Sequence, residues 1–307
     1  MLLYQNLRLL RILRITWKVD LIMLVLCAIA YWLEVHVIKD FVRVPTTLPS
    51  LIGTAIAFFI GFNNNQAYDR WWEARTIWGG IVNDSRSWAR NVLFYSSRND
   101  LGYTDDLPEA DELPRRMILR HISFLYALKK ALRGAKDKSY FKYISEEEGQ
   151  QVSKYTNVPS ALLDRQAKDL NYLKRTGRID GFQFMTLNEM IVRFSDGMGR
   201  SERIKGTVFP PTYLYFTRLF IWLFVMIVTL SIADDTGPWS ILLSWIIGFV
   251  FHVAHINGLS LMNPFEATPF GISLNAITRT IEINLLELLG AEEVPSPVEV
   301  INDEFIM

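Results

Sequence analysis

Apolar stretches long enough to cross a membrane are the feature that most limits how this chain can fold. Val19 to Ile38 and Leu214 to Ala233 each run for about 20 residues, the length that an α-helix needs to cross about 30 Å of hydrocarbon. Trp239 to Ile256 is nearly as long, and its only ionisable side chains are two histidines. We therefore predict a membrane-spanning helix from each of these stretches.

A fourth apolar stretch, Leu48 to Phe62, is shorter than the others. Its run of about 15 residues would rise only about 22 Å in a helix, which is too little to face lipid unaided. Such a segment is better suited to packing among other helices or to lining a pore. Counting it as the second crossing gives a chain that crosses the membrane four times.

The basic residues predict the orientation of these helices. Arg8, Arg11, Arg14 and Lys18 precede the first stretch with no acid among them, whereas the turn "DDTGP" between the last two stretches is acidic. The positive-inside rule then places the N-terminus in the cytoplasm, and four crossings return the C-terminus to the same side. Because no small-residue cleavage site follows the first stretch, we expect it to be retained.

The chain accordingly divides into five expected segments. They are a cytosolic N-terminal segment (1–18), a first pair of membrane helices (19–62), a cytosolic helical region (63–210), a second pair of membrane helices (211–256), and a cytosolic C-terminal helix with a tail (257–307). Apolar residues at spacings of three and four predict helices between Asp69 and Ile204, with Ser145 and Ser160 as N-caps. Gly290 is expected to close the last helix. The predicted fold is all-α, a multi-span helical membrane protein with a helical cytosolic domain.

Charge and composition exclude several classes of function. The 32 basic and 32 acidic residues give a formal net charge of zero, so the basic excess typical of nucleic-acid binding is absent. The single cysteine, Cys27, cannot form an internal disulfide or a cysteine metal site, and we interpret it as a small buried residue. No Gly-rich phosphate loop and no convincing pair of nucleophile and base occur, which argues against an enzyme and predicts no cofactor.

The stretch "GFNNNQAYDRWWEAR" begins where the short apolar segment ends. Residues four apart share a helix face, so two neighbouring faces can be assigned before it. Thr54, Phe58 and Phe62 form one face, and Gly53, Ala57 and Gly61 form a series of small residues beside it. Small residues let membrane helices approach closely, so a ring of identical helices would turn the two phenylalanines toward its axis. The result would be a hydrophobic constriction, although the same spacing also occurs in ordinary core packing.

Several polar and aromatic residues near this segment have two interpretations. Asn63, Asn64 and Asn65 follow the apolar face directly, and their carboxamides could offer a donor or an acceptor to a passing ion. The charged residues from Asp69 to Arg75 could steer ions, but we favour salt bridges that position helices. The tryptophans from Trp71 to Trp88 are interpreted as interfacial anchors rather than stacking platforms. His252 and His255 are three residues apart, and packing is favoured over a metal site, so no metal is predicted.

Long motifs in this sequence resemble those of the bestrophins in their bacterial branch. The resemblance rests on "GFNNNQAYDRWWEARTIWGGIVNDSRSWAR", "SERIKGTVFPPTY", "NPFE" and "RTIEINLLELLG", and it covers essentially the whole chain. It implies a pentameric, ring-forming ion channel in a bacterial cytoplasmic membrane, with one axial pore. The neck of the pore, which the family forms from its second helix, then falls on Thr54, Phe58 and Phe62.

The resemblance also implies a second constriction in the cytosolic part. Its position corresponds to the helical region before "NEM", where Phe182 and Ile179 are placed ahead of Met185 as aperture residues. In animal members a run of acids after the Asn-Pro-Phe segment joins a calcium clasp, but here only Glu266 is present. Since calcium needs about six to eight oxygen ligands, this segment gives poor support for a calcium site.

Ion selectivity is the least determined property of the predicted channel. An uncharged neck selects largely through dehydration and through charges elsewhere in the pore. By resemblance we expect monovalent anions of the chloride type first, with a monovalent cation channel of the same fold as the alternative. A non-conducting membrane scaffold is the remaining possibility. The expected partners are further copies of this chain, the lipid bilayer and the permeant ions, without nucleic acid.

Overall fold

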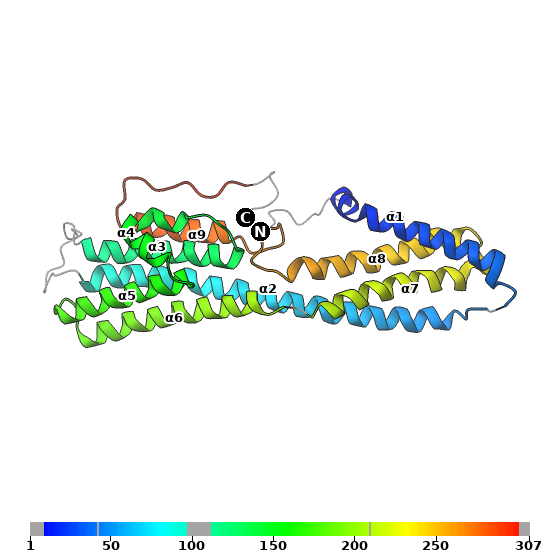
Figure 1. Ribbon diagram of the computed structural model, residues 1–307, viewed down its shortest axis with the longest axis horizontal. Helices are drawn as coiled ribbons and strands as arrows, with labels where there is room; N and C mark the ends of the chain where they lie inside the picture. The colour runs from blue at the N-terminus through cyan, green and yellow to red at the C-terminus, as the bar shows by residue number, and fades with distance from the viewer. Residues whose placement is uncertain (1–8, 42, 97–111, 209, 301–307) are drawn as a thin grey trace. The chain divides into compact units, whose positions relative to one another are not determined.

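The computed structural model describes residues 9–41, 43–96, 112–208 and 210–300. Throughout these ranges the regular elements are helices, which confirms the all-α prediction (Figure 1). Residues 1–8 of the predicted N-terminal segment and residues 301–307 of the predicted tail lie outside the described residues. The chain divides into two compact units, which we call the membrane unit (residues 9–71 and 208–263) and the helical unit (residues 72–207 and 264–300).

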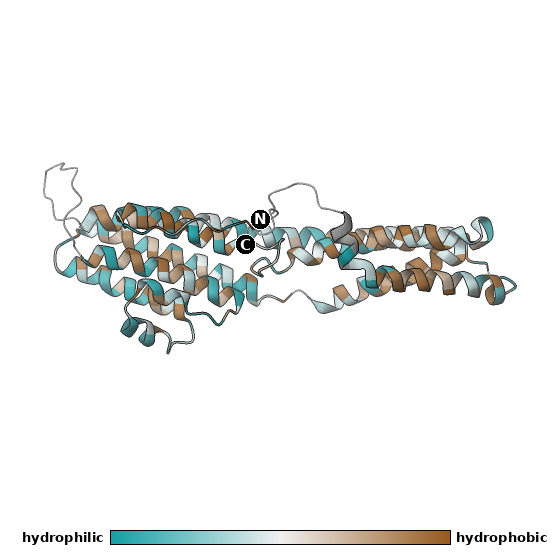
Figure 2. Ribbon diagram, turned by 90° about the horizontal axis from the view of Figure 1, so that it is seen from above, coloured by the Kyte–Doolittle hydropathy of each residue, from teal (hydrophilic) through white to brown (hydrophobic). Residues whose placement is uncertain are grey.

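Three helices of the membrane unit are long and apolar enough to cross a bilayer. They are α1 (Leu9–Leu33), which continues into the single π-helical turn η1 (Glu34–Ile38), α7 (Pro211–Thr236) and α8 (Trp239–Leu261). Hydrophobic residues make up much of these helices (Figure 2). The first part of α2 (Thr47–Ser96) completes this unit, and α2 passes into the helical unit between Trp71 and Trp72.

Aliphatic and aromatic side chains from α1, α2 and α7 form the core of the membrane unit. Ile56 and Ile60 of α2 are buried together with Met23 of α1 and Phe224 of α7. The ring of Phe224 meets that of Phe251 edge to face, with 5.2 Å between centroids. In lipid such packing replaces the hydrophobic effect as the force that holds helices together.

Helix α8 places its small and polar residues inside the unit and its large apolar residues outside. Its buried residues are Ser240, Ser244, Gly248, His252, His255 and Gly258. Its exposed large residues include Leu242, Leu243, Ile246, Ile247 and Val250. The helix therefore approaches its neighbours closely through its small residues. At Gly248, for example, an added Cβ would collide with Met23 and Val225.

The helical unit packs six further elements around the second part of α2. They are α3 (Glu112–Arg133), the 3₁₀ turn η2 (Ser139–Tyr143), α4 (Glu146–Val152), α5 (Val158–Arg175), α6 (Gly181–Gly206) and α9 (Leu274–Leu288). Helix α3 lies against α5, α6 and α9 (Figure 1). The core contains Trp78 and Trp88 of α2, which are completely buried. Trp88 meets Phe194 of α6 edge to face, with 6.0 Å between ring centroids.

The burial of Trp78 and Trp88 corrects the prediction that the tryptophans of α2 are interfacial anchors. Both indoles lie in the core of the helical unit, where a large aromatic side chain buries the most apolar surface. Only the side chain of Trp72 is clearly exposed, at 55%. Sequence spacing could not distinguish these positions, because the burial of a residue on α2 depends on which other helices pack against it.

The helix ends follow ordinary capping chemistry, with one correction. Ser145 caps α4, as predicted, by accepting a hydrogen bond from the Glu148 backbone N–H. The N-cap of α5 is Asn157 and not Ser160, because the Asn157 side chain accepts the Ser160 N–H at 3.0 Å. Gly290 follows α9 with φ of 62°, a left-handed conformation that glycine adopts without strain, which confirms it as the residue that closes this helix.

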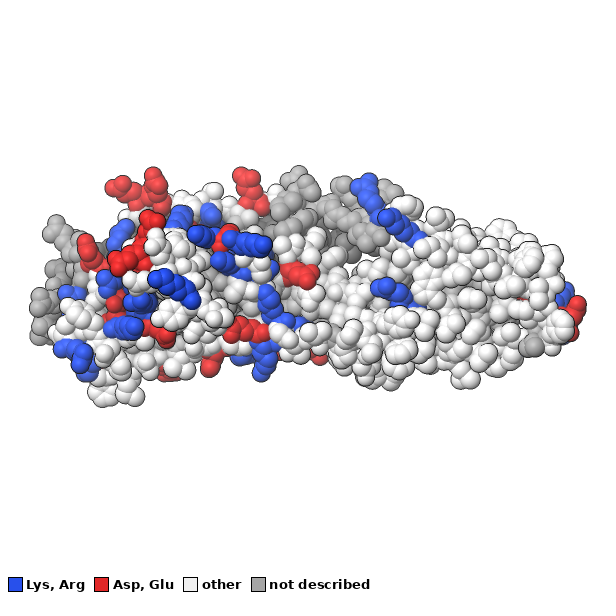
Figure 3. Space-filling view, in the orientation of Figure 1, with Lys and Arg blue, Asp and Glu red and all other residues white. Residues whose placement is uncertain are grey.

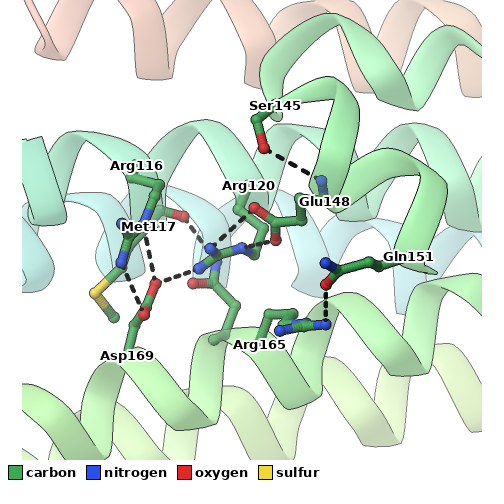
Figure 4. A network of polar contacts seen from close by, with 9 residues as sticks. Arg116, Met117, Arg120, Ser145, Glu148, Gln151, Arg165 and Asp169 are labelled. Atoms are coloured by element: carbon green, nitrogen blue, oxygen red, sulfur yellow. Dashed lines mark hydrogen bonds and ion pairs between the residues drawn. The ribbon is translucent and has the colours of Figure 1, made fainter.

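A buried arginine joins three helices of the helical unit (Figure 4). The guanidinium of Arg120 on α3 pairs with Glu148 of α4 and, at 2.5 Å, with Asp169 of α5. Arg116 adds a second cation to Asp169 at 2.9 Å. The pKa of Arg120 is raised, because the hydrogen bonds and negative charges of the two carboxylates outweigh the burial that would lower it. Every charge of this network therefore has a partner.

A buried carboxylate fixes α9 in the same manner. Glu282 is fully buried, and it accepts hydrogen bonds from Tyr126, at 2.5 Å, and from Tyr143. The Arg279 guanidinium lies 2.8 Å from one carboxylate oxygen and the Lys142 ammonium 3.2 Å from the other. On the face shown in Figure 3, acidic and basic side chains are gathered over the helical unit and intermixed there.

Candidate functional site

The candidate site begins with the two sides of α2 in the membrane unit. Ile56 and Ile60 are buried against α7, whereas Phe58 and Phe62 are 67% and 55% exposed. Each phenylalanine follows its isoleucine by two residues, which is about 200° around a helix. The aromatic side of α2 therefore points away from the core of its own chain. The rings of Phe58 and Phe62 contact each other edge to face at 4.6 Å between centroids.

Thr54, the third predicted neck residue, is exposed one turn before Phe58 on the same side of α2. Its hydroxyl donates to the Ser50 carbonyl at 2.8 Å, so the hydrogen-bonding proton is used inside the helix. The hydroxyl oxygen can still accept from water, which makes this end of the face easier to wet than the two rings.

The small residues of α2 do not share one role. Gly53 is buried, and a Cβ there would lie 3.0 Å from the Phe224 ring of α7. The prediction that Gly53 joins one copy of α2 to another is therefore wrong, since its space is filled by the same chain. Ala57 and Gly61 are exposed, and no atom lies within 4 Å of a Cβ built on Gly61.

The three asparagines point in different directions. The Asn64 amide donates to the Ala254 carbonyl of α8 at 3.0 Å, and its side chain fits directly against Gly258. The Asn64 amide therefore connects α2 to α8, which leaves it less free to meet a passing ion than the prediction assumed. Asn63 is half-buried and lies 3.4 Å from the Thr217 hydroxyl, whereas Asn65 is exposed and bonds to Asp69 at 3.4 Å.

A cavity of about 270 Å³ lies beside the aromatic face, between α2 and the start of α7. Its lining residues are Phe59, Phe62, Asn63, Gln66, Pro210 and Tyr213. The cavity places amide groups next to aromatic rings at the end of the apolar part of α2. Asn63 is thus the asparagine that both contacts Thr217 of α7 and lines this cavity.

The predicted aperture residues separate into one buried and two exposed positions in the helical unit. Ile179 is only 3% exposed and belongs to the core of the helical unit, so its burial argues against a role as an aperture residue. Phe182 and Met185 are 84% and 68% exposed at the start of α6. Ile179 precedes the capping box of Asp180 and Gln183, whereas Phe182 and Met185 lie within α6, so helical spacing does not relate the three residues to one face.

Among the charged residues after the asparagines, Glu73 joins two helices through salt bridges, as predicted. Glu73 of α2 pairs with Arg203 of α6 at 2.8 Å and with Arg200 at 3.7 Å. In the described part of the chain no group of three His, Cys, Asp or Glu side chains is arranged to hold a metal ion. His252 and His255 are buried within the membrane unit, which agrees with the packing interpretation.

Sequence reasoning missed Asp20, an acid inside α1. The residue is 5% exposed, its carboxylate accepts the Thr16 hydroxyl at 2.5 Å, and its backbone carbonyl accepts the Trp245 indole N–H at 3.0 Å. The available signal was an acid within an apolar span, since ionisable residues in membrane helices are rare and usually face the protein interior.

These features can be compared with known proteins. The family model for the bacterial and fungal bestrophin proteins matches residues 5–287. This chain belongs to the bestrophin family.

Curated relatives carry channel names. The voltage-dependent anion channel-forming protein mll4386 of Mesorhizobium japonicum is 25% identical over 266 residues, which cover 87% of this chain and 81% of that protein. The voltage-dependent anion channel-forming protein YneE of Escherichia coli is 27% identical over 250 residues, covering 81% of this chain and 78% of the relative. Neither name describes an enzyme.

A solved structure has the same fold. The crystal structure of a bacterial bestrophin homologue from Klebsiella pneumoniae matches with a TM-score of 0.81 and 22% identity. The match covers 89% of this bestrophin and 98% of that chain. The arrangement of helices is therefore shared at a level of identity where side chains have largely diverged.

Proposed function

We propose that this bestrophin forms an anion-conducting channel, assembled as a pentamer in the bacterial cytoplasmic membrane, with α2 lining its neck. The single observation that carries this proposal is the aromatic side of α2. Phe58 and Phe62 project away from the core in the apolar stretch Leu48 to Phe62 of α2, which is too short to face lipid alone. The names of the relatives support anions as the permeant species.

The neck would gate by wetting and drying. Two phenylalanines from each copy of α2 would form stacked apolar rings around the axis, and such a tube excludes water unless it widens. Thr54 would keep one end hydrated. Ala57 and Gly61 would allow neighbouring copies of α2 to approach closely, because both are exposed and Gly61 has free space for an adjacent helix.

Ion flux from sealed liposomes tests the function. Purified protein reconstituted under a potassium chloride gradient should pass current, and the sign of the reversal potential should be that of an anion pathway. A reversal potential of the opposite sign would indicate a cation channel with the same fold. Absence of current from correctly assembled protein would favour a non-conducting scaffold.

Phe58→Ala tests the neck. If Phe58 lines the pore, its removal should raise the flux by roughly tenfold, the change expected when the barrier falls by about 1.4 kcal/mol. Phe220→Ala is the matched control, because Phe220 is an exposed phenylalanine on α7 of the same unit. Strong destabilisation by Phe58→Ala with unchanged flux per channel would identify Phe58 as a packing residue.

Native mass spectrometry of the detergent-solubilised protein tests the assembly. The wild type should give a pentamer, and Gly61→Leu should shift the population toward smaller species because the new side chain occupies the proposed contact. Gly199→Leu is a control at an open glycine of the helical unit. A conducting monomer would contradict the proposed ring.

The exposed residues at the start of α6 are proposed as the second constriction. Phe182→Ala and Met185→Ala should change the relative permeability of small anions more than they change the open probability. The comparison of chloride with a larger anion in the same liposomes measures this. Unchanged permeability ratios in both variants would place the constriction at other residues.

A further inference from the structure

One segment of the helical unit carries an excess of positive charge. Residues 129–142, which run from the end of α3 into η2, contain six basic residues and one acid, Asp137, in a chain whose formal net charge is zero. The basic residues are Lys129, Lys130, Arg133, Lys136, Lys138 and Lys142. Cations also favour the C-terminal end of a helix in general, so the charge alone does not define a site. The packing of α3 against α9 supplies the geometry.

Two hydrogen bonds fix how α3 lies against α9. The Tyr126 hydroxyl donates to Glu282 at 2.5 Å, and the Arg133 guanidinium donates to Asn275 at 2.8 Å. The residue number falls along α9 as it rises along α3, so the two helices are antiparallel. In this register Lys129, which lies between Tyr126 and Arg133, faces the turn of α9 between their two partners. Lys129 and Arg133 are four residues apart and share a face of α3.

Four cations meet at this seam between α3 and α9. Arg279 lies on the turn of α9 that Lys129 faces, and its guanidinium is 2.8 Å from one carboxylate oxygen of Glu282. The Lys142 ammonium of η2 lies 3.2 Å from the other oxygen. Glu282 is thus already paired with two cations. Within the described part of the chain, Lys129 and Arg133 form no ion pair with a carboxylate.

Lys129 and Arg133 are half-buried, which makes the missing ion pairs costly. The Lys129 ammonium lies 4.4 Å from the centroid of the Tyr126 ring, and this cation–π contact replaces only part of the hydration that burial removes. Nε of Arg133 is buried and has no hydrogen-bond partner. Buried polar atoms in folded proteins are nearly always hydrogen-bonded, so this N–H indicates an acceptor that the chain itself does not supply.

The pKa of Lys129 reflects the same imbalance. Burial lowers this pKa most and the charge of Arg133 lowers it further, whereas Asp137 and Glu282 raise it by less. Burial also lowers the pKa of Arg133. Both side chains are therefore less stable in their charged forms than they would be in water. An anion bound beside them would reverse this effect.

The donors at the seam suit a phosphate group. A guanidinium presents its N–H groups in a planar fork that matches phosphate oxygens, and an ammonium adds a compact charge. We propose that Lys129, Arg133 and Arg279 form a binding site for a phosphate-bearing ligand between α3 and α9. The site opens to solvent beside Lys142, whose side chain is 58% exposed. A soluble diphosphate and the headgroup of an anionic lipid share this chemistry. The proposal does not depend on ion conduction.

Calorimetric titration of the full chain in detergent with inorganic pyrophosphate measures binding directly. Lys129→Gln and Arg133→Gln should each weaken the affinity by about tenfold, as expected for the loss of a hydrogen bond between charged groups. Arg133→Lys, which keeps the charge and loses the fork, should lie between the wild type and Arg133→Gln. Lys174→Gln is the matched control, because Lys174 is exposed on α5 of the same unit. Equal affinities in the wild type and both Gln variants would overturn the site.

Labelling of lysines with acetic anhydride reads the site in the unaltered protein, so it does not depend on the folding of a variant. Only the neutral amine reacts, and a bound anion that raises the pKa of Lys129 by about one unit lowers its neutral fraction about tenfold. Saturating pyrophosphate should reduce the acetylation of Lys129 by about this factor and leave Lys174 unchanged. Peptide mass spectrometry measures both. An equal change at the two lysines would mean that the ligand binds elsewhere.

The same labelling in liposomes distinguishes the two sources of phosphate. The protein is reconstituted in phosphatidylcholine, which is zwitterionic, or in phosphatidylglycerol, which is anionic. Protection of Lys129 in phosphatidylglycerol without added pyrophosphate would identify a lipid headgroup as the ligand. Protection that appears in both membranes only after pyrophosphate is added would identify a soluble ligand. If neither condition protects Lys129, the site is wrong, whether or not the protein conducts ions.

Discussion

The best-paired buried charges of the helical unit contrast with a buried carboxylate of the membrane unit. In the helical unit the buried Arg120 meets two carboxylates, and the buried Glu282 meets two tyrosines and two cations. In the membrane unit the buried carboxylate of Asp20 keeps an oxygen without a partner. A buried charged group whose hydrogen bonds and ion pairs are all made is held in its charged form. A buried group that lacks some of these bonds is less strongly held in that form.

The paired and the unpaired buried groups should therefore contribute differently to the stability of the two units. The paired groups of the helical unit hold α3, α4, α5 and α9 in one arrangement, so removing one partner should destabilise the unit and leave its chemistry otherwise unaltered. The unpaired groups of the membrane unit have little to lose in stability when they are replaced. The comparison therefore predicts larger stability losses from replacing the buried, paired charges of the first unit than from replacing the buried, unpaired groups of the second.

Arg120→Ala should give the largest loss of stability. It leaves Glu148 and Asp169 without their buried cation, and breaking a buried pair in this way costs about 3–5 kcal/mol. Hydrogen exchange of α4 and α5 measures the change in the free energy of local unfolding. Arg115→Ala is the control, because Arg115 is exposed on the same helix. Equal effects of the two variants would show that the network does not hold these helices.

Glu282→Gln should follow, with a loss of about 2 kcal/mol, the usual value of hydrogen bonds to a charged group. Burial alone would raise the pKa of Glu282, but hydrogen bonds from Tyr126, Tyr143 and Lys142 and the charge of Arg279 hold it below its ordinary value. A depressed carboxyl pKa contributes stability above the unfolded-state pKa, and this contribution is lost as pH falls through the folded-state pKa.

Acid denaturation checks this assignment. The wild type should lose stability below about pH 4.3, the ordinary glutamate pKa, and the Gln variant should lose less over the same range. Denaturant unfolding followed by circular dichroism at several pH values gives both curves. Parallel curves for the two proteins would contradict the role of the Glu282 charge.

Gly258→Ala should destabilise the membrane unit by about 2 kcal/mol, a typical effect of overpacking. The added Cβ collides with the side chain of Asn64 and would lie 3.4 Å from its Cα, which forces α2 and α8 apart. Thermal unfolding in detergent measures the loss. In the double variant with Asn64→Ala the loss should be smaller than the sum, because the two atoms that collide are no longer both present. Strict additivity would show that the two residues do not interact.

His121 should produce a smaller effect, visible only with pH. Burial lowers the pKa of His121 to about 3, and its Nε2 lies 2.8 Å from the Ser85 hydroxyl. Since the unfolded chain binds the proton more readily, stability falls as pH drops below about 6.5 and has decreased by about 1.4 kcal/mol one pH unit lower. His121→Gln, which can still donate to Ser85, should remove this slope between about pH 5 and about pH 7. A slope that persists in the variant would belong to another group.

Arg193→Ala should change nothing measurable. Its ion pairs with Glu189, at 2.7 Å, and Asp84, at 3.6 Å, lie on the surface, where solvent screens them. Thermal unfolding of this variant sets the baseline for the other four. A loss comparable to that of Arg120→Ala would mean that burial is not what separates strong pairs from weak ones in the helical unit.

The sequence predicted three long apolar helices, a helical region between them and the exposed aromatic side of α2, because these depend on length and spacing along one helix. Residues whose role depends on a partner from another helix were harder to predict. Gly53 and Gly61 are equivalent in the pattern of small residues, and only the Phe224 ring of α7 makes them different. Asn64 and Asn65 are likewise equivalent in the sequence pattern, and they differ in the structure because only Asn64 bonds to α8. Ile179 lies just before α6 and Phe182 within it, so spacing along one helix could not predict that the first is buried and the second exposed.

The inverted distribution on α8 has a consequence for how this protein can diverge. Its outward residues Leu242, Leu243, Ile246 and Val250 need only be apolar, so one can replace another with little penalty. Its inward residues must be small or must carry a specific polar group, because Gly248 and Gly258 have no room for a side chain. In a scan of substitutions along α8, the outward face should therefore tolerate many apolar replacements, and the inward face should tolerate few replacements of any kind. A hydropathy profile of α8 is dominated by its large outward residues, which are the ones that can be exchanged most freely. The small inward residues, which tolerate the fewest substitutions, contribute little to that profile.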